Sequence, residues 1–125
     1  MECLVVWEAE GAYREFTGVI SGGEILEANL ELYADPRFKN ASYLIDNYSE
    51  ISGSTVESPD LEALGVTDEI MSKEYHDIKI ALIVAQEPRE IDKAKSYCEQ
   101  MKDKGFKYEY FLTVDNARKW AANKL

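Results

Sequence analysis

Short apolar runs, several with alternating apolar and polar positions, predict five β-strands along the chain. The first two runs are separated by a break at Gly11, and two strands joined by a Glu-Gly turn are typical of a β-hairpin. The most apolar run, Ile78–Ala85, is typical of a central parallel strand that is buried on both faces. The five predicted strands cover residues 4–9, 12–20, 41–48, 78–85 and 107–114.

Capping residues and helical spacing between these runs predict four helices. Ser21 and Glu24 have the spacing of a capping box, which predicts the start of the first helix. Ser58 is the expected cap of the second helix, and Thr67 is expected to cap a further segment of it. The other two expected helix starts are Pro88 and Asp115.

The predicted order is β-β-α-β-α-β-α-β-α in a single domain, residues 1–125, with a mixed, mostly parallel five-stranded sheet. Strand-helix-strand crossovers are right-handed in nearly all proteins, so strands that add on one side place the helices mainly on one face. The other face would then be bare, with Trp7 and Tyr13 on it. An exposed aromatic surface often marks a partner face, so both a monomer and a homodimer stay open.

The chain of 125 residues carries a net charge of −10, and acidic side chains dominate its first part. Residues 1–77 hold 17 acidic and 4 basic side chains, whereas residues 78–125 hold 7 acidic and 10 basic ones. Because phosphate groups are bound by clustered Lys and Arg, this balance argues against nucleic acid and anionic membranes as partners. No apolar run approaches the ~20 residues of a membrane span.

The sequence lacks the common motifs for metals, nucleotides and nucleophilic catalysis, so we expect no metal, no cofactor and no enzymatic activity. The single histidine, His76, is expected to interact with a helix dipole, with a catalytic base as the alternative. The N-terminus has no basic segment typical of a signal peptide, which predicts a cytoplasmic location. Cys3 and Cys98 are therefore expected to be free thiols.

The most polar strand end is the segment from Asp46 to Ser58. Ligands and partners of open α/β sheets gather at the carboxyl ends of strands, so this segment is the candidate site. Asp46 is interpreted as a strand-end carboxylate that accepts N–H bonds from the loop, with a site acid as the alternative. The candidate contact residues are Asp46, Ser52, Ser54, Thr55 and Ser58.

Five features of the chain together resemble one known family: the hairpin, the strand ending in Leu-Ile-Asp46, the Ser/Thr loop, the run IKIALIVA and the final DNARKW. That family is the STAS (anti-sigma-factor antagonist) domains. The chain is most similar to the small STAS-related bacterial proteins of unknown function. The resemblance implies a β-α superhelix. It also implies a phosphorylated serine at the start of the helix, as in the STAS regulators, and the corresponding residues here are Ser52, Ser54 and Thr55. The family signature Asp-Ser-Ser-Gly is replaced here by the sequence ISGST, which leaves phosphorylation open.

Three functional hypotheses follow. The first is a non-enzymatic regulatory module that binds a protein partner through residues 46–58. The second is a small-ligand or lipid-binding module, which predicts a closed pocket on the order of a few hundred Å³ between the first strands' aromatics and the helices. The third is an enzyme that uses Asp46 or His76, which requires a second titratable group within hydrogen-bond reach.

Overall fold

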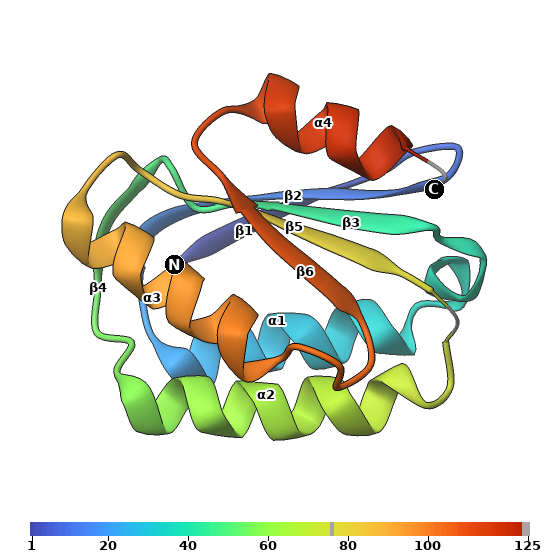
Figure 1. The fold of residues 1–125 in the computed structure, drawn as a ribbon, viewed down its shortest axis with the longest axis horizontal. Helices are drawn as coiled ribbons and strands as arrows, with labels where there is room; N and C mark the ends of the chain where they lie inside the picture. The colour runs from blue at the N-terminus through green and yellow to red at the C-terminus, as the bar shows by residue number, and fades with distance from the viewer. Residues whose placement is uncertain (76, 124–125) are drawn as a thin grey trace.

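The computed structural model describes residues 1–75 and 77–123, and its elements confirm the predicted α/β class with a mixed, mostly parallel sheet (Figure 1). The strands are β1 (Glu2–Trp7), β2 (Gly11–Ile20), β3 (Tyr43–Asn47), β4 (Ile51–Ser54), β5 (Lys79–Ile83) and β6 (Lys107–Phe111). The helices are α1 (Gly22–Ala34), the short 3-10 helix η1 (Pro36–Asn40), α2 (Ser58–Ser72), α3 (Pro88–Gln100) and α4 (Val114–Ala122).

Within the described residues, the strands form one six-stranded sheet in the order β1-β2-β3-β5-β6, with β4 paired to β2. β1 runs antiparallel to β2, which confirms the hairpin, and the other pairs are parallel. β4 is one strand more than the five predicted. It lies in the Ser/Thr loop that follows β3, where Ile51–Ser54 pairs with Gly18–Ile20 at the end of β2.

Helices cover both faces of the sheet, with α1, α2 and α3 on one face and α4 on the other (Figure 1). α1, α2 and α3 each connect parallel strands that add on the same side, so they share a face as predicted. The prediction that the second face is bare is wrong. α4 packs there and shares a small core with the sheet, made of Ile45, Ala81, Ile83, Ala117 and Ala121.

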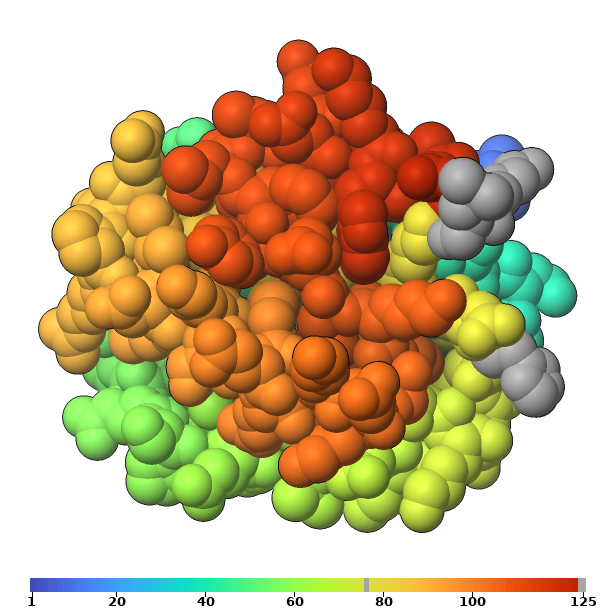
Figure 2. All heavy atoms as spheres, in the orientation of Figure 1, coloured from blue at the N-terminus to red at the C-terminus, as the bar shows by residue number. Residues whose placement is uncertain are grey.

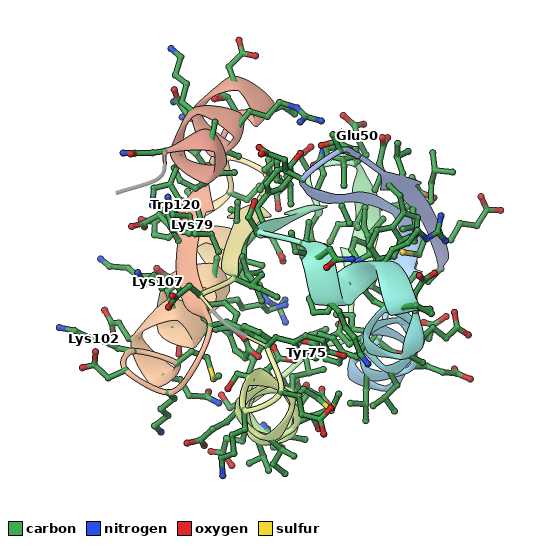
Figure 3. All side chains as sticks on the ribbon, turned by 90° about the vertical axis from the view of Figure 1, so that its right-hand side faces the viewer. Glu50, Tyr75, Lys79, Lys102, Lys107 and Trp120 are labelled. Carbon is green, nitrogen blue, oxygen red and sulfur yellow. The ribbon has the colours of Figure 1, made fainter. Side chains whose placement is uncertain are left out.

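The aromatic residues that were expected on a bare face are partly buried. The Arg37 guanidinium lies 4.6 Å from the centre of the Trp7 ring, and that of Arg118 lies 5.3 Å from the centre of the Tyr13 ring. Figure 3 shows Trp120 of α4 beside Lys79 of β5, where Lys79 Nζ donates to the Trp120 carbonyl oxygen over 3.0 Å. Trp7 packs against the core beneath α1, α2 and α3, whereas Tyr13 packs against the core beneath α4, so the expectation that both lie on one face is wrong.

Capping residues set the ends of α1 and α4. The Ser21 hydroxyl accepts the Glu24 backbone N–H over 3.2 Å, which confirms the predicted start of α1. α4 is capped by Thr113 instead of the predicted Asp115, because the Thr113 hydroxyl accepts the Asn116 N–H over 3.2 Å.

α2 begins at a different cap from the one predicted and has no internal break. Glu57 replaces Ser58 as the cap residue, because the Glu57 N–H donates to the Asp60 carboxylate over 2.9 Å. Thr67 lies inside the continuous helix and does not cap a new segment. Its hydroxyl donates to the Ala63 carbonyl oxygen over 3.2 Å, so it does not compete for helix N–H groups.

Both cysteines, Cys3 and Cys98, are free and partly buried, which confirms the predicted free thiols. On the face viewed in Figure 2, atoms of α3, of the edge strand β6 and of α4 lie at the front. Among the described residues, no helix combines the length and the apolar character needed to cross a bilayer.

Candidate functional site

Arg14 and Asp46 form a buried ion pair between the sheet and its helices. They are register partners on β2 and β3, and their side chains are 1% and 5% exposed. Arg14 Nε donates to Asp46 Oδ1 over 2.7 Å, and Nη2 donates to Oδ2 over 2.8 Å. Burial opposes the positive charge, but the Asp46 carboxylate outweighs this effect and raises the pKa of Arg14, so the pair is ionic.

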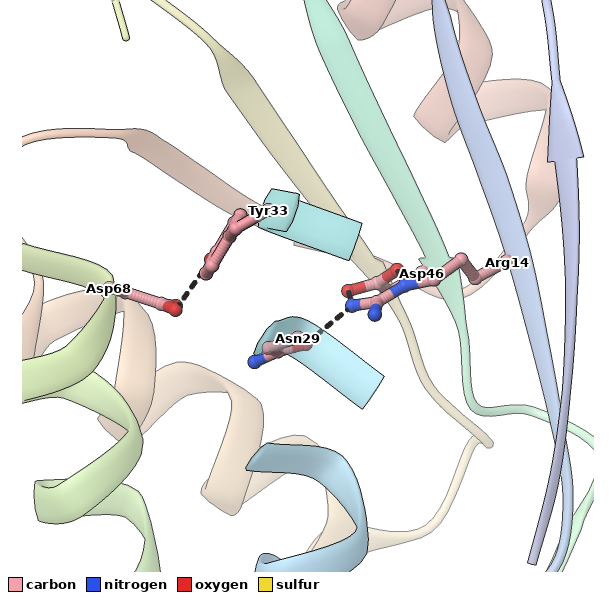
Figure 4. Close-up of polar contacts among 5 residues, drawn as sticks. All are labelled: Arg14, Asn29, Tyr33, Asp46 and Asp68. Carbon is pink, nitrogen blue, oxygen red and sulfur yellow. Dashed lines mark hydrogen bonds and ion pairs between the residues drawn. The ribbon is translucent and has the colours of Figure 1, made fainter. Parts of the chain in front are cut away.

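The guanidinium also contacts α1 but keeps one nitrogen unpaired. Nη2 donates a second bond to Asn29 Oδ1 over 2.7 Å, and Figure 4 shows the side chain reaching from β2 toward Asn29, with Tyr33 and Asp68 beyond it. In the part of the chain that the structure describes, Arg14 Nη1 is the one buried side-chain nitrogen or oxygen without a hydrogen-bond partner. An unpaired buried donor usually costs about 1–3 kcal/mol, so this nitrogen reduces the stabilisation that the ion pair provides.

A second buried carboxylate, Asp68 of α2, accepts three tyrosine hydroxyls. Tyr33 donates over 2.6 Å, and Tyr97 and Tyr108 each donate over 2.8 Å. Burial raises the pKa of Asp68, and the three tyrosine hydrogen bonds oppose that rise. Burial and the neighbouring carboxylate raise the pKa of each tyrosine, so all three remain protonated donors.

Both polar clusters line one cavity of about 100 Å³ between the sheet and α1, α2 and α3. Partly exposed residues, Ser54, Glu90 and Lys93, also line it, so the cavity approaches the surface between β4 and α3. A cavity of roughly 150 Å³ holds benzene, so this one holds a few waters or a compact molecule and is too small for a lipid chain. Most of its wall is apolar and includes Ile20, Ile25, Leu44, Leu64, Ile80 and Leu82.

The structure separates the residues that the sequence predicts as one contact surface. Asp46 is buried and accepts the Arg14 guanidinium, so its interpretation as an acceptor of loop N–H bonds is wrong. Ser54 lines the cavity, where its hydroxyl accepts the Val56 N–H over 3.1 Å and lies 3.4 Å from Lys93 Nζ. The hydroxyl residues that remain exposed are Ser52, Thr55 and Ser58.

Sequence reasoning missed Arg14, Asn29 and Asp68. A signal for Arg14 was present, because it lies between Ala12 and Phe16 on the core-facing side of an alternating strand. A charge at such a position is costly unless it is paired, and this points to a buried partner. Asp68 follows Leu64 by four residues, which places it on the same buried face of α2.

Other candidate chemistry is weaker. His76 and any role as a base lie outside the described residues. Among the residues that can be placed, no three His, Cys, Asp or Glu side chains come together as metal ligands. A groove of about 510 Å³ between α3 and β6 has both lysines and acidic side chains in its wall, namely Lys95, Glu99, Lys102, Asp103, Lys107 and Glu109. Its mixed charge selects no class of ligand.

The architecture is that of an open α/β sheet with an N-terminal antiparallel strand and helices on both faces. No protein-family model matches the sequence, and no curated protein matches it. Among solved structures, the chain is similar to an uncharacterized DUF3478-family protein with a SpoIIAA-like fold from Shewanella loihica PV-4. The two share 13% identity with a TM-score of 0.57, over 97% of this chain and 93% of that one. The fold is therefore SpoIIAA-like, as the resemblance to anti-sigma-factor antagonists predicts.

Proposed function

We propose that this domain is a cytoplasmic, non-enzymatic binding module whose ligand is a compact molecule held in the cavity beneath the sheet. The observation that carries the proposal is the cavity itself, whose mostly apolar wall also includes the polar residues Arg14, Asn29, Asp46, Tyr48 and Asp68. A cavity that served only to accommodate imperfect packing would be lined by apolar groups alone.

The rigidity of the wall supports binding rather than catalysis. The Arg14 guanidinium is fixed by Asp46 and Asn29, and it lies 5.1 Å from the centre of the Phe16 ring. Asp68 is likewise saturated by three hydroxyls, so neither carboxylate is free to take a proton from a ligand. A mostly apolar pocket with a few fixed polar side chains in its wall is typical of a recognition site.

The test is a nuclear magnetic resonance titration of the 15N-labelled protein with benzene, cyclopentanone and isobutyramide. We expect saturable shifts confined to amides around the cavity for at least one of these compounds. Ala94→Leu adds three carbons to the cavity wall and should abolish the shifts, because Ala94 lines the cavity from α3. Ala122→Leu makes the same change at an exposed position of α4 and should leave them intact.

Two results would contradict the proposal. The first is the absence of saturable shifts with every compound, which would assign the cavity to trapped water. The second is unchanged binding in a folded Ala94→Leu variant, which would place the compounds elsewhere on the protein.

A protein partner is the second candidate function. The exposed hydroxyls of Ser52, Thr55 and Ser58 favour it, because they follow one another on β4, on the connection to α2 and at the first residue of α2. This regulatory role predicts phosphate on Ser52, Ser54 or Thr55 in protein isolated from its own cells, read by mass spectrometry. It also predicts that Thr55→Asp weakens binding of a partner, whether another protein or a second copy, with the melting temperature unchanged. Ser96→Asp on the exposed face of α3 is the matched control.

A further inference from the structure

The first strand, β1, forms an edge of the sheet with backbone groups available for pairing. Among the described residues β1 pairs with β2 alone, in an unbroken antiparallel register. The Glu8 N–H donates to the Gly11 carbonyl oxygen over 2.8 Å, which makes these two residues a hydrogen-bonded pair of the hairpin. Hydrogen-bonded pairs alternate along antiparallel strands, so the residues whose N–H and C=O groups point away from β2 are Cys3, Val5 and Trp7.

The side chains of β1 do not protect this edge. Natural edge strands usually carry Lys, Pro or a bulge that prevents another strand from pairing, and residues 2–7 contain none of these. Three apolar side chains are exposed instead, namely Leu4 (61%), Val5 (39%) and Val6 (44%). The exposed side chains of the opposite edge strand, β6, are the charged Lys107 and Glu109. β1 is therefore the edge that is suited to accept a further strand.

Acidic side chains flank this edge on both faces of the sheet. Glu2 and Glu15 lie on the face of α4, because Glu2 alternates with Leu4 and Glu15 is the register partner of Leu4. On the other face, burial and nearby carboxylates, among them that of Glu31 in α1, raise the pKa of the Cys3 thiol. The Glu31 carboxylate therefore lies near the edge as well. No ion pair within the described ranges involves any of these three carboxylates.

The basic side chains near β1 already have acidic partners. Arg37, whose guanidinium lies over the Trp7 ring, pairs with Asp35 over 2.8 Å. Arg118 pairs with Glu8 over 2.8 Å. A second copy of this chain would therefore bring carboxylates toward carboxylates at the edge, whereas Lys or Arg side chains of another partner would meet opposite charge.

From these observations we infer that β1 binds an extended segment of another protein that alternates apolar and basic side chains. The backbone of this segment pairs with the outward groups of β1 and adds a strand to the sheet. Its apolar side chains cover Leu4, Val5 and Val6, and its basic side chains meet the flanking carboxylates. β1 contributes no residue to the wall of the cavity, so this surface is separate from the proposed ligand site.

A titration of the 15N-labelled protein with three peptides tests the inference. Acetylated and amidated Lys-Val-Lys-Val-Lys-Val has the expected chemistry, and Glu-Val-Glu-Val-Glu-Val reverses its charge. The third peptide is the lysine peptide with N-methylated valines, which lack the backbone donors. We expect the lysine peptide to bind at least about tenfold more tightly than either control, because several ion pairs or hydrogen bonds of a few-fold each are lost. It should also slow hydrogen exchange of the Val5 amide.

Two variants of the protein locate the binding surface. Val5→Pro removes an N–H that points away from β2, so the hairpin keeps its own hydrogen bonds. Leu4→Lys adds the kind of charge that protects natural edge strands. Each variant should weaken binding of the lysine peptide at least about tenfold. Val66→Lys is the matched control, because Val66 lies on α2 and is 59% exposed, and it should leave binding unchanged.

The outcomes separate this inference from the proposed function. Absence of saturable binding of the lysine peptide would overturn the inference, as would equal binding of the lysine and glutamate peptides. Unchanged binding in a folded Leu4→Lys variant would overturn it even if Val5→Pro does not fold. A dimer in sedimentation equilibrium that Leu4→Lys dissociates would assign the edge to a second copy and overturn it too. None of these results bears on the small-molecule titration, which reports on the cavity.

Discussion

Arg14 and Asp46 lie directly opposite each other on neighbouring parallel strands, and each is almost wholly removed from solvent. Their register makes the bidentate contact possible, because partners on adjacent strands project from the same face of the sheet. A slip of one residue between β2 and β3 would turn one of the two side chains to the opposite face of the sheet and leave the other buried without its partner. The ion pair therefore favours one register, in addition to forming the wall of the cavity.

Removal of one member of the pair should be far more costly than removal of both. Arg14→Met leaves the Asp46 carboxylate buried without its counter-ion, and we expect a loss of about 3–5 kcal/mol in the free energy of unfolding. Arg14→Met/Asp46→Leu replaces both charges by apolar groups and should recover most of this loss. Urea unfolding of the single and double variants at neutral pH measures the difference.

Arg118→Met provides the control for this prediction. Arg118 pairs with Glu8 over 2.8 Å, but its side chain is 43% exposed. Exposed ion pairs contribute about 0–1 kcal/mol, so this variant should remain close to the unaltered protein. Equal losses in Arg14→Met and Arg118→Met would show that the buried pair carries no special energetic role.

Asp68 should give the protein a distinct dependence of stability on pH. Burial raises its folded pKa above the ordinary value of 3.8, so the folded state binds this proton more tightly than the unfolded state. The contribution of Asp68 to the free energy of unfolding is therefore greatest at low pH and falls as the pH rises from about 3.8 through the folded pKa. The free energy of unfolding, compared with that of Asp68→Asn, should decrease through this window and then become constant.

Asp35 provides a comparison of opposite sign. Hydrogen bonds from the Arg37 side chain and backbone lower the pKa of Asp35 to about 2. Compared with Asp35→Asn, the contribution of Asp35 to the free energy of unfolding should be present above pH 3.8 and be lost as the pH falls toward 2. If the free energy of unfolding, compared with that of Asp68→Asn, increases with pH, then the three tyrosine hydrogen bonds outweigh the effect of burial on the pKa of Asp68.

Much of the fold was predictable because its signals are local. Neighbouring residues alone are enough to recognise the capping box at Ser21 and the apolar run that contains β5. β4 was missed because its pairing with Gly18–Ile20 is a long-range contact made by a short segment that contains glycine. α4 was misplaced because it follows the last strand and joins no strand pair, so the crossover rule does not apply to it.

The site was only partly predictable for a similar reason. Asp46 could be singled out as a polar residue at a strand end, but its partner depends on the register of β2 and β3. The link between Asp68 and Tyr108 joins residues 40 positions apart, on elements whose packing no local pattern specifies. Local sequence indicated which residues were unusual, whereas tertiary structure determined which of them meet.

Cys98 should react slowly with alkylating reagents in the folded protein. Burial, reinforced by Glu109 and Glu99, raises the pKa of the Cys98 thiol to about 12. Because the thiolate is the nucleophile, its reaction with iodoacetamide at pH ~8 should be slower by about three orders of magnitude than that of an ordinary thiol. Peptide mass spectrometry after timed quenching measures the rate, and the same reaction in urea provides the control. Equal rates with and without urea would contradict the raised pKa.

A methyl group added at Gly11 should destabilise the sheet, whereas the same change at Gly23 should not. A Cβ atom at Gly11 would lie 2.5 Å from the Tyr43 carbonyl oxygen, and these two residues are register partners of β2 and β3. Because the contact is with backbone, Gly11→Ala must move the strands apart, at a cost of about 1–3 kcal/mol. Gly23 lies in the first turn of α1, where an added Cβ would meet no atom within 4 Å, so Gly23→Ala should stabilise the helix by up to about 1 kcal/mol. Thermal unfolding of both variants tests the sheet register, and equal shifts in Tm would contradict the close approach of Gly11 to Tyr43.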